Sequence, residues 1–266
     1  MLAIFRFIAV LSCVASIGLG QDEITSKVTH DPVAESFLQR SLSAMGAKTD
    51  PMNQVATVTG TLKLLGDDEI DFPVVIKSQG NTLMRTELST KQGVRVFVIN
   101  NGRGVIQYPD GKSRVLNEEN TILQRASHVP VLGILSDGNN PNVNVQYEGR
   151  SVFNNKSVDS VAVSSFKGKT DEEIAQNIDR TKLHLFLNTD TGLLEGMSYL
   201  NYSENDPTFV QTFQVIYSNY QSIQGFMVPL QQDTFADGKP FLSLTISTIA
   251  FDGSVADSDF NLAGAK

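Results

Sequence analysis

The segment "IQGFMVPLQQDTFADGKPFLSLTIS", residues 223–247, alternates apolar and polar side chains on both sides of the Asp-Gly pair at 237–238. Alternation with a period of two is typical of a β-strand that turns one face toward a core, and Asp-Gly is a frequent hairpin turn. The segment carries no recognisable set of reactive groups. It therefore predicts a hairpin whose regular pattern serves the architecture of the fold.

The same alternation recurs through most of the chain and predicts about a dozen strands. Asn-Gly at 101–102 and Asp-Gly at 110–111 supply further hairpin turns. No linker or low-complexity tract divides the strands, so we expect one mainly β domain with a few helices over residues 21–266. The first two strands place four apolar side chains on a shared face: Val58, Leu62, Phe72 and Val74.

Two short helices with apolar faces interrupt this pattern. Asp31 and Pro32 are suited to the first turn of a helix that Gly46 can close. Pro130 can open the second helix, which is apolar nearly all round and must bury itself. A third, polar helix is expected at 170–179. The apolar residues of the first helix include Phe37, Leu38 and Leu42, and those of the second are Val131, Leu132, Ile134 and Leu135.

The first twenty residues have the pattern of a secretory signal peptide. One cation, Arg6, precedes an apolar run that ends in small residues up to Gly20, which predicts cleavage before Gln21. Acylation of Cys13, the single cysteine, is the alternative, but the sequence ahead of it is short for a lipoprotein signal. We therefore expect a soluble exported protein in the periplasm or outside the cell, without disulfides.

Composition and motifs exclude several functional classes. The chain has 29 Asp and Glu against 21 Lys and Arg, a net charge of −8, which argues against nucleic acid and anionic lipid surfaces as partners. It lacks a nucleophile elbow, a phosphate-binding loop and histidines at zinc-ligand spacing. Turn chemistry explains the acidic tail around Asp257 at least as well as a calcium site does. We expect no catalytic residue, metal or cofactor.

The sequence does not decide which face of the sheet Arg85 occupies. It lies in the middle of a predicted strand, with Glu87 on the same face. If that face is the outer one, the two side chains form an ordinary solvated pair that contributes little stability. If it is the inner one, Arg85 needs buried partners and has a functional role or holds a mobile element in place.

Seven residues stand out in the last three predicted strands, their turns and the tail: Tyr217, Tyr220, Gly225, Pro229, Gly238, Asp259 and Phe260. With these residues and this order of elements, the chain resembles the superfamily of bacterial outer-membrane lipoprotein carriers and receptors, LolA and LolB. The resemblance implies a strongly curved, unclosed antiparallel sheet, a half-barrel, with helices over its concave face. It also implies an apolar cavity for acyl chains and an inward arginine that holds a helical lid, for which Arg85 is the candidate.

The function expected from these observations is that of a non-enzymatic carrier that holds a lipid or a lipoprotein acyl chain. We expect it to act as a monomer, with envelope proteins as further partners. A cell-envelope scaffold whose cavity is filled by its own side chains is the first alternative, and a hydrolase of unrecognised type is the second. The predicted cavity residues are Val58, Leu62, Phe72, Val74, Val131, Leu132, Ile134 and Leu135, under a lid that carries Phe37, Leu38 and Leu42.

Overall fold

The structure is a computed structural model of the whole chain. The predicted signal peptide and Val131 lie outside the described residues. Among the helices that are described, none is both long enough and apolar enough to cross a membrane. The structure describes residues 28–46, 55–66, 69–80, 82–116, 120–121, 132–136, 138, 140–203, 208–251 and 255–261.

Thirteen strands, three α-helices and a 3-10 turn account for most of these residues. The helical elements are α1 (Pro32–Ala44), α3 (Leu132–Ser136), α4 (Asp171–Arg180) and the 3-10 turn η3 (Asp257–Phe260). The strands are β1 (Val55–Leu64), β2 (Ile70–Gln79), β3 (Leu83–Thr90), β4 (Gly93–Asn100), β5 (Arg103–Gln107), β6 (Ser113–Val115), β7 (Val143–Phe153), β8 (Lys156–Ser165), β9 (Leu183–Asn188), β10 (Leu194–Tyr202), β11 (Val210–Ile223), β12 (Phe226–Ala236) and β13 (Lys239–Ala250).

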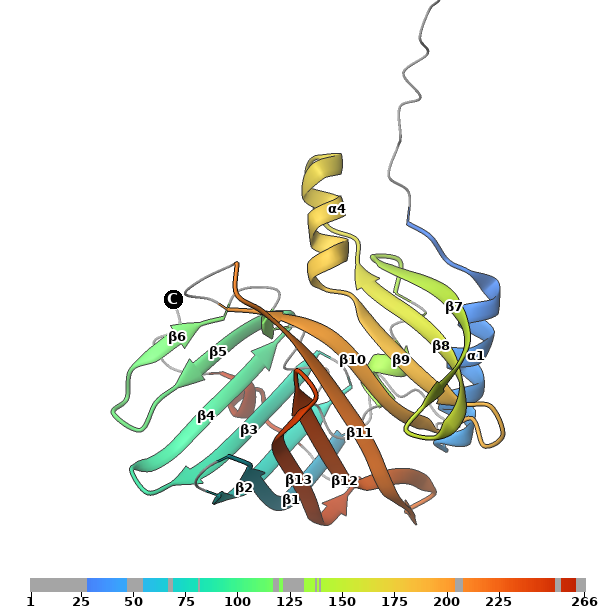
Figure 1. Ribbon diagram of the computed structural model, residues 1–266. Coiled ribbons are helices and arrows are strands. Elements are labelled where there is room, and N and C mark those ends of the chain that lie inside the picture. The colour runs from blue at the N-terminus through green and yellow to red at the C-terminus, as the bar shows by residue number, and fades with distance from the viewer. Residues whose placement is uncertain are drawn as a thin grey trace, which may run out of the picture.

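All thirteen strands form one antiparallel sheet in the order β6-β5-β4-β3-β2-β1-β13-β12-β11-β10-β9-β8-β7. The sheet curls strongly and does not close, since β6 and β7 form its two edges (Figure 1). The first and last strands of the chain are therefore neighbours near the middle of the sheet, where Thr57 lies opposite Ala250. The predicted half-barrel with a few helices is confirmed.

The hairpin turns have the backbone conformation that their sequences favour. At the β4–β5 turn Asn101 and Gly102 have φ angles of 48° and 84°, and at the β12–β13 turn Asp237 and Gly238 have 48° and 75°. Two successive residues with positive φ match the right-handed twist of the flanking strands, and Asn, Asp and Gly adopt them most readily. The segment at 223–247 is thus the predicted hairpin.

The helix predicted to start at Pro32 is α1, and Asp31 caps it by accepting a hydrogen bond from the Val33 amide at 2.9 Å. The polar helix expected at 170–179 is α4, capped by Thr170. The short apolar helix after Pro130 is α3, although its described part begins at Leu132. These three predictions of helices are confirmed.

Helices α1 and α3 cover one part of the concave face, which we call the inner face of the sheet. Their buried side chains belong to an apolar cluster with the inner residues of β7 to β11, such as Leu185 and Val215. Val58 and Val74 belong to a separate cluster on β1, β2, β3, β4, β12 and β13. The predicted lid with Phe37, Leu38 and Leu42 therefore does not lie above these two valines, because α1 and α3 pack on the other half of the sheet.

The opposite, outer face of β3 and β4 is covered by the end of the chain. The 3-10 turn η3 contacts both strands, and Phe260, only 2% exposed, packs against Val96 and Val98. Apolar side chains are thus buried on both faces of this part of the sheet. This arrangement places Met84 and Leu88 on the inner face and Arg85 on the outer one.

Candidate functional site

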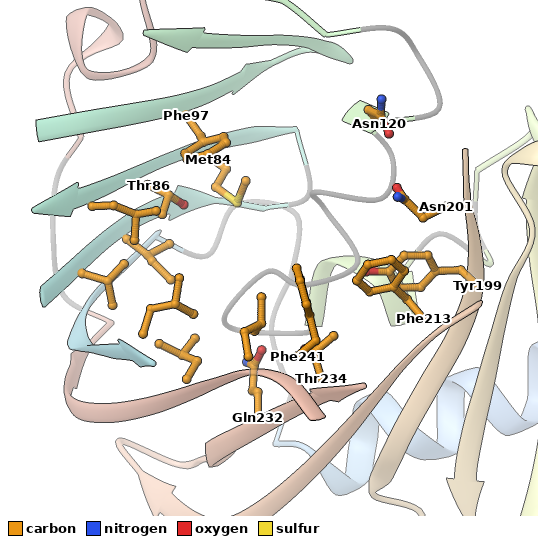
Figure 2. Close-up of a pocket in the computed structure, with 16 residues that line it drawn as sticks. Met84, Thr86, Phe97, Asn120, Tyr199, Asn201, Phe213, Gln232, Thr234 and Phe241 are labelled. Carbon is orange, nitrogen blue, oxygen red and sulfur yellow. The ribbon is translucent and has the colours of Figure 1, made fainter. Parts of the chain in front are cut away.

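A cavity of about 330 Å³ lies on the inner face of the half of the sheet that α1 and α3 leave uncovered. Figure 2 shows Met84 and Phe97 on one side of it, and Tyr199 and Phe213 on the other. The floor comes from β1, β2, β3, β12 and β13. The lining consists of Leu62, Val74, Ile76, Met84, Thr86, Leu88, Phe97, Asn120, Tyr199, Asn201, Phe213, Gln232, Thr234, Phe241, Leu242 and Leu244.

Strand register brings these residues together. Leu62 lies opposite Phe72 on one neighbouring strand and opposite Leu244 on the other. Leu244 in turn lies opposite Gln232. Directly opposed residues of antiparallel strands point to the same face, so Leu62, Leu244 and Gln232 cross the cavity floor from β1 to β12, and Phe72 continues the row beyond the lining.

Aromatic rings mark the border between the cavity and the cluster under α1. The rings of Tyr199 and Phe213 stack with their centroids 5.7 Å apart, and Phe241 meets Phe213 edge-on at 5.3 Å. Tyr199 is buried, and this burial raises the pKa of its phenol far above the usual range, so that the group stays neutral. The border is therefore aromatic and uncharged.

The chemistry of the lining is that of a binding cavity. Every lining residue is apolar, aromatic or neutral polar, and none carries a charged side chain. Within the part of the chain that the structure describes, no three His, Cys, Asp or Glu residues gather closely enough to hold a metal ion. A lining of this kind favours apolar ligands and supplies neutral groups that can orient them.

Gln232 and Thr234 are the buried polar residues of the lining, and Gln232 differs in having an unpaired side-chain nitrogen. Its side chain is 2% exposed, and its Nε2 has no hydrogen-bond partner among the described residues. Figure 2 shows its amide end rising from β12 toward the other lining residues. Buried amides in proteins are nearly always hydrogen-bonded, so an orphaned one in a cavity wall needs a partner from outside the chain, either a water molecule or a ligand atom.

The structure places the predicted cavity residues of β1 and β2 at or next to this cavity. Leu62 and Val74 line it, and Val58 is fully buried in the apolar cluster beside them. Phe72 is half-buried on the same face, opposite Leu62, but does not belong to the lining. Ligand binding by these four residues stays a prediction.

The predicted residues of the helices lie elsewhere. Ile134 and Leu135 are buried against α1, together with Leu38 and Leu42. Phe37 packs on the same cluster, with its ring 5.1 Å from that of Tyr147. None of these five residues lines the cavity, and of Leu132 only the backbone is described.

Arg85 faces outward, which corrects its expected role as a latch for a lid. Its Nε donates to Glu87 at 2.5 Å, and its Nη1 donates to the backbone carbonyl of Asp259 at 3.2 Å. It therefore fastens the end of the chain to the outer face, on the side of the sheet away from the cavity. Arg95, opposite Leu88, does share the inner face, and its guanidinium lies 4.8 Å from the ring centroid of Tyr108.

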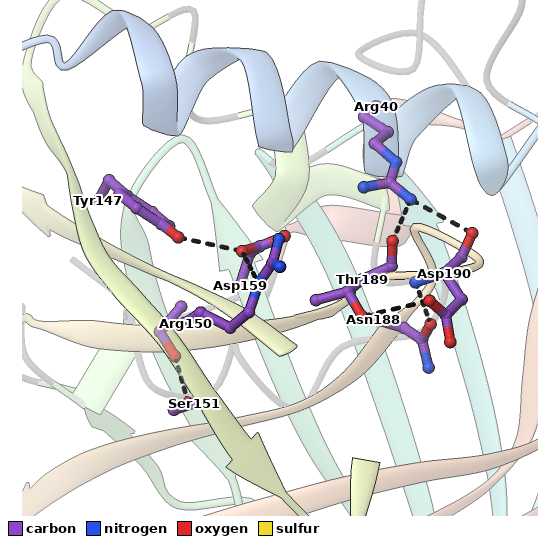
Figure 3. A network of polar contacts seen from close by, with 9 residues as sticks. Arg40, Tyr147, Arg150, Ser151, Asp159, Asn188, Thr189 and Asp190 are labelled. Carbon is purple, nitrogen blue, oxygen red and sulfur yellow. Dashed lines mark hydrogen bonds and ion pairs between the residues drawn. The ribbon is translucent and has the colours of Figure 1, made fainter. Parts of the chain in front are cut away.

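Helix α1 is fastened to the sheet by other polar groups (Figure 3). Arg40 donates from Nη2 to the backbone carbonyls of Thr189 and Asp190, at 2.5 and 3.2 Å, in the β9–β10 turn. At the other end of the helix, Asp31 accepts from the backbone amide of Tyr147 at 3.1 Å. Both ends of α1 are thus tied to the sheet, and neither tie uses Arg85.

The polar contacts beneath α1 centre on Asp159. It is 1% exposed and accepts hydrogen bonds from the Tyr147 hydroxyl at 3.0 Å and from Arg150 Nε at 3.3 Å (Figure 3). Burial, and then the hydrogen bond to Asp159, raise the pKa of the Tyr147 phenol. A buried carboxylate with these donors, away from the cavity, serves to orient β7 and β8.

Reasoning from the sequence missed Gln232 and the aromatic border. Gln232 occupies the inward phase of β12, in step with Val228 and Leu230, where an apolar residue is expected. A polar residue in that phase was the available signal. The border around Phe213 and Phe241 had no such signal, since these residues lie on β11 and β13 and meet only through the fold.

Comparison with known proteins identifies the fold. No protein-family model and no curated protein matches the sequence. Among solved structures, a candidate outer membrane lipoprotein-sorting domain from Vibrio parahaemolyticus aligns with a TM-score of 0.59 and 11% identity, over 86% of this chain and 97% of its own. A LolA superfamily protein from Nitrosomonas europaea aligns with a TM-score of 0.58 and 13% identity, over the same shares.

A third solved structure agrees with these two. A DUF1329 family protein from Desulfovibrio piger aligns with a TM-score of 0.57 and 11% identity, over 86% of this chain and 97% of its own. At such identities the likeness concerns the fold alone. The chain therefore has the fold of LolA superfamily proteins, as the resemblance in its sequence implied.

Proposed function

We propose that the protein is a non-enzymatic carrier that holds a lipid or a lipoprotein acyl chain in the cavity on its inner face. The observation that carries this proposal is the uncharged, mainly apolar cavity of about 330 Å³. Its size lies at the lower end of the range of about 300–1,000 Å³ that is typical of small-molecule sites. The named relation of two similar structures to LolA or lipoprotein sorting supports the same class of ligand.

The energetics of apolar burial suit such a cargo. Each buried methylene contributes about 0.8 kcal/mol, so a chain of several methylenes binds without any ionic contact. The cavity walls offer apolar contacts from β1, β2, β3 and β13, including Leu62, Val74 and Leu244. A scaffold protein whose own side chains fill the space is less well supported, because the inner face retains this volume.

The proposed place of action is the periplasm or the outside of the cell. The pattern of a secretory signal peptide in residues 1–20 supports this localisation. N-terminal sequencing of the protein recovered from its own cells should start at Gln21. If an acylated Cys13 is recovered instead, the protein is a membrane-anchored carrier and the proposal of a free carrier is rejected.

Displacement of a fluorescent probe tests the proposal. The neutral hydrophobic dye N-phenyl-1-naphthylamine should bind the folded protein, and long-chain lipids should displace it. Thr86→Phe puts a ring into the cavity and should weaken dye binding about tenfold or more. Ser89→Phe, on the outer face of the same strand, is the matched control and should leave binding unchanged. If the wild-type protein does not bind the dye, the carrier proposal fails and the scaffold alternative gains.

A further inference from the structure

The orphaned amide of Gln232 allows the class of ligand to be narrowed. The residue lies at the junction of the two apolar clusters, opposite the buried Tyr217 on one side and Leu244 on the other. Its Nε2 has no partner among the described residues, and the lining residues around it are mostly apolar. An amide held in such surroundings gains a hydrogen bond only from what enters the cavity.

The geometry of the side chain permits that bond. Gln232 forms part of the cavity wall, and the torsion at its terminal amide is broad, so the group rotates at small cost. Nε2 is a donor, and its complement is therefore an acceptor oxygen of the ligand. Thr234, two residues along on the same face and only 4% exposed, brings a hydroxyl to the same wall.

The charge of the ligand follows from the rest of the wall. No lining residue is charged, so an ionised carboxylate beside Gln232 would lose its hydration without gaining a counter-charge. A neutral carbonyl oxygen gains the hydrogen bond and carries no such penalty. Arg95, on the same face, lies outside the lining and stacks on Phe97 and Tyr108.

We infer that the cavity selects neutral amphiphiles, such as acyl chains in ester or amide linkage, by a hydrogen bond from Gln232 Nε2 to the carbonyl oxygen. Free fatty-acid anions are disfavoured because their charge finds no counter-charge in the lining. Plain alkanes are disfavoured because they leave the Gln232 amide unpaired. This inference rests on the proposed carrier function. It adds a residue that sets specificity and the chemical form of the cargo.

Three matched competitors test the inference by displacement of N-phenyl-1-naphthylamine. They are a long-chain methyl ester, the n-alkane with the same number of non-hydrogen atoms, and the carboxylate of the same chain at neutral pH. The decisive quantity is the ratio of ester affinity to alkane affinity, compared between wild type and Gln232→Met. Methionine keeps the length and shape of the side chain and removes its donor, so the ratio should fall about tenfold.

Gln231→Met is the matched control, since the neighbouring glutamine points to the outer face, where it donates to Asp233 at 2.8 Å. It should leave the ratio unchanged, and Gln232→Leu should reproduce the effect of Gln232→Met. An equal ratio in wild type and both Gln232 variants overturns the inference, and so does a carboxylate that binds wild type as tightly as the ester. If no competitor displaces the dye and the dye itself does not bind, the carrier function fails instead.

Discussion

The unpaired amide of Gln232 should lower the stability of the ligand-free protein, and this effect can be measured without any ligand. A buried donor that lacks a partner lowers stability by about 1–3 kcal/mol, because it has lost its hydrogen bonds to water. We expect Gln232→Met to raise the free energy of unfolding of the ligand-free protein by about 1–2 kcal/mol, as measured by urea denaturation. Gln231→Met should instead lower it, since that residue donates to the Ser243 hydroxyl at 2.5 Å. A loss of stability in Gln232→Met would mean that the amide has a partner.

Arg85 provides a second prediction about a single side chain. Its partly exposed pair with Glu87 lies on the outer face, so Arg85→Ala should lower the free energy of unfolding by less than about 1 kcal/mol. Affinity for N-phenyl-1-naphthylamine should stay unchanged, because the cavity lies on the other side of the sheet. A clear loss of dye affinity in this variant, with the sheet intact by circular dichroism, would support the predicted role of Arg85 as a latch for a lid.

The sequence of its strand does not show which face of the sheet Arg85 occupies. In residues 83–88 both alternating phases contain apolar side chains, Leu83 in one and Met84 and Leu88 in the other. Both phases are apolar because η3 covers the outer face while the cavity lies on the inner face. Period-two alternation fixes which residues share a face, but it identifies the inner face only where one phase is fully polar.

Helix α1 carries the prediction on pH. Hydrogen bonds from the amides of Tyr147 and Val33 lower the pKa of the Asp31 carboxyl below its usual range. A lowered pKa in the folded state means that the carboxylate adds stability above the unfolded pKa of about 3.9, and that this is lost as pH falls through the folded pKa. Asp31→Asn should therefore be less stable than wild type at pH 6, and the difference should shrink as the pH falls below about 3.9.

Thermal unfolding of both proteins across this range of pH checks the expectation. Asp190→Asn is a suitable control, because its contact with α1 goes through the backbone carbonyl to Arg40 and persists in the variant. A gap between wild type and Asp31→Asn that stays constant down to pH 3 would show that the carboxylate's charge plays no part in holding α1.

The sequence predicts where the helices lie along the chain, but it does not predict which part of the sheet they cover. Caps and apolar spacing sufficed to locate α1, with Asp31 before it and Pro32 at its start. Its place on the sheet depends on contacts far along the chain, such as the Asp31 amide donating to the Val145 carbonyl at 3.0 Å. Such a contact leaves no local pattern, so the sequence did not reveal that α1 and α3 cover β7 to β11.

For the molecule as a whole, the continuous sheet predicts one cooperative unit. The two apolar clusters lie on the same sheet, and β11, β12 and β13 pair without a break between them. We expect urea unfolding to be a single transition, with the same midpoint by far-ultraviolet circular dichroism and by tyrosine fluorescence. Two separated transitions would divide residues 21–266 into independent units.

The pairing of β1 with β13 also dictates how the chain must reach this state. Because Thr57 lies opposite Ala250, the middle of the sheet forms only after nearly the whole chain is available. Pairing across such a distance closes a long loop and slows folding. Until Lys239–Ala250 docks, β1 and β12 expose unpaired backbone edges, which are sites for aggregation. A chain without β13 would therefore keep two half-sheets, each with an unpaired edge that is prone to aggregation. A chaperone that shields those edges would act before β13 docks.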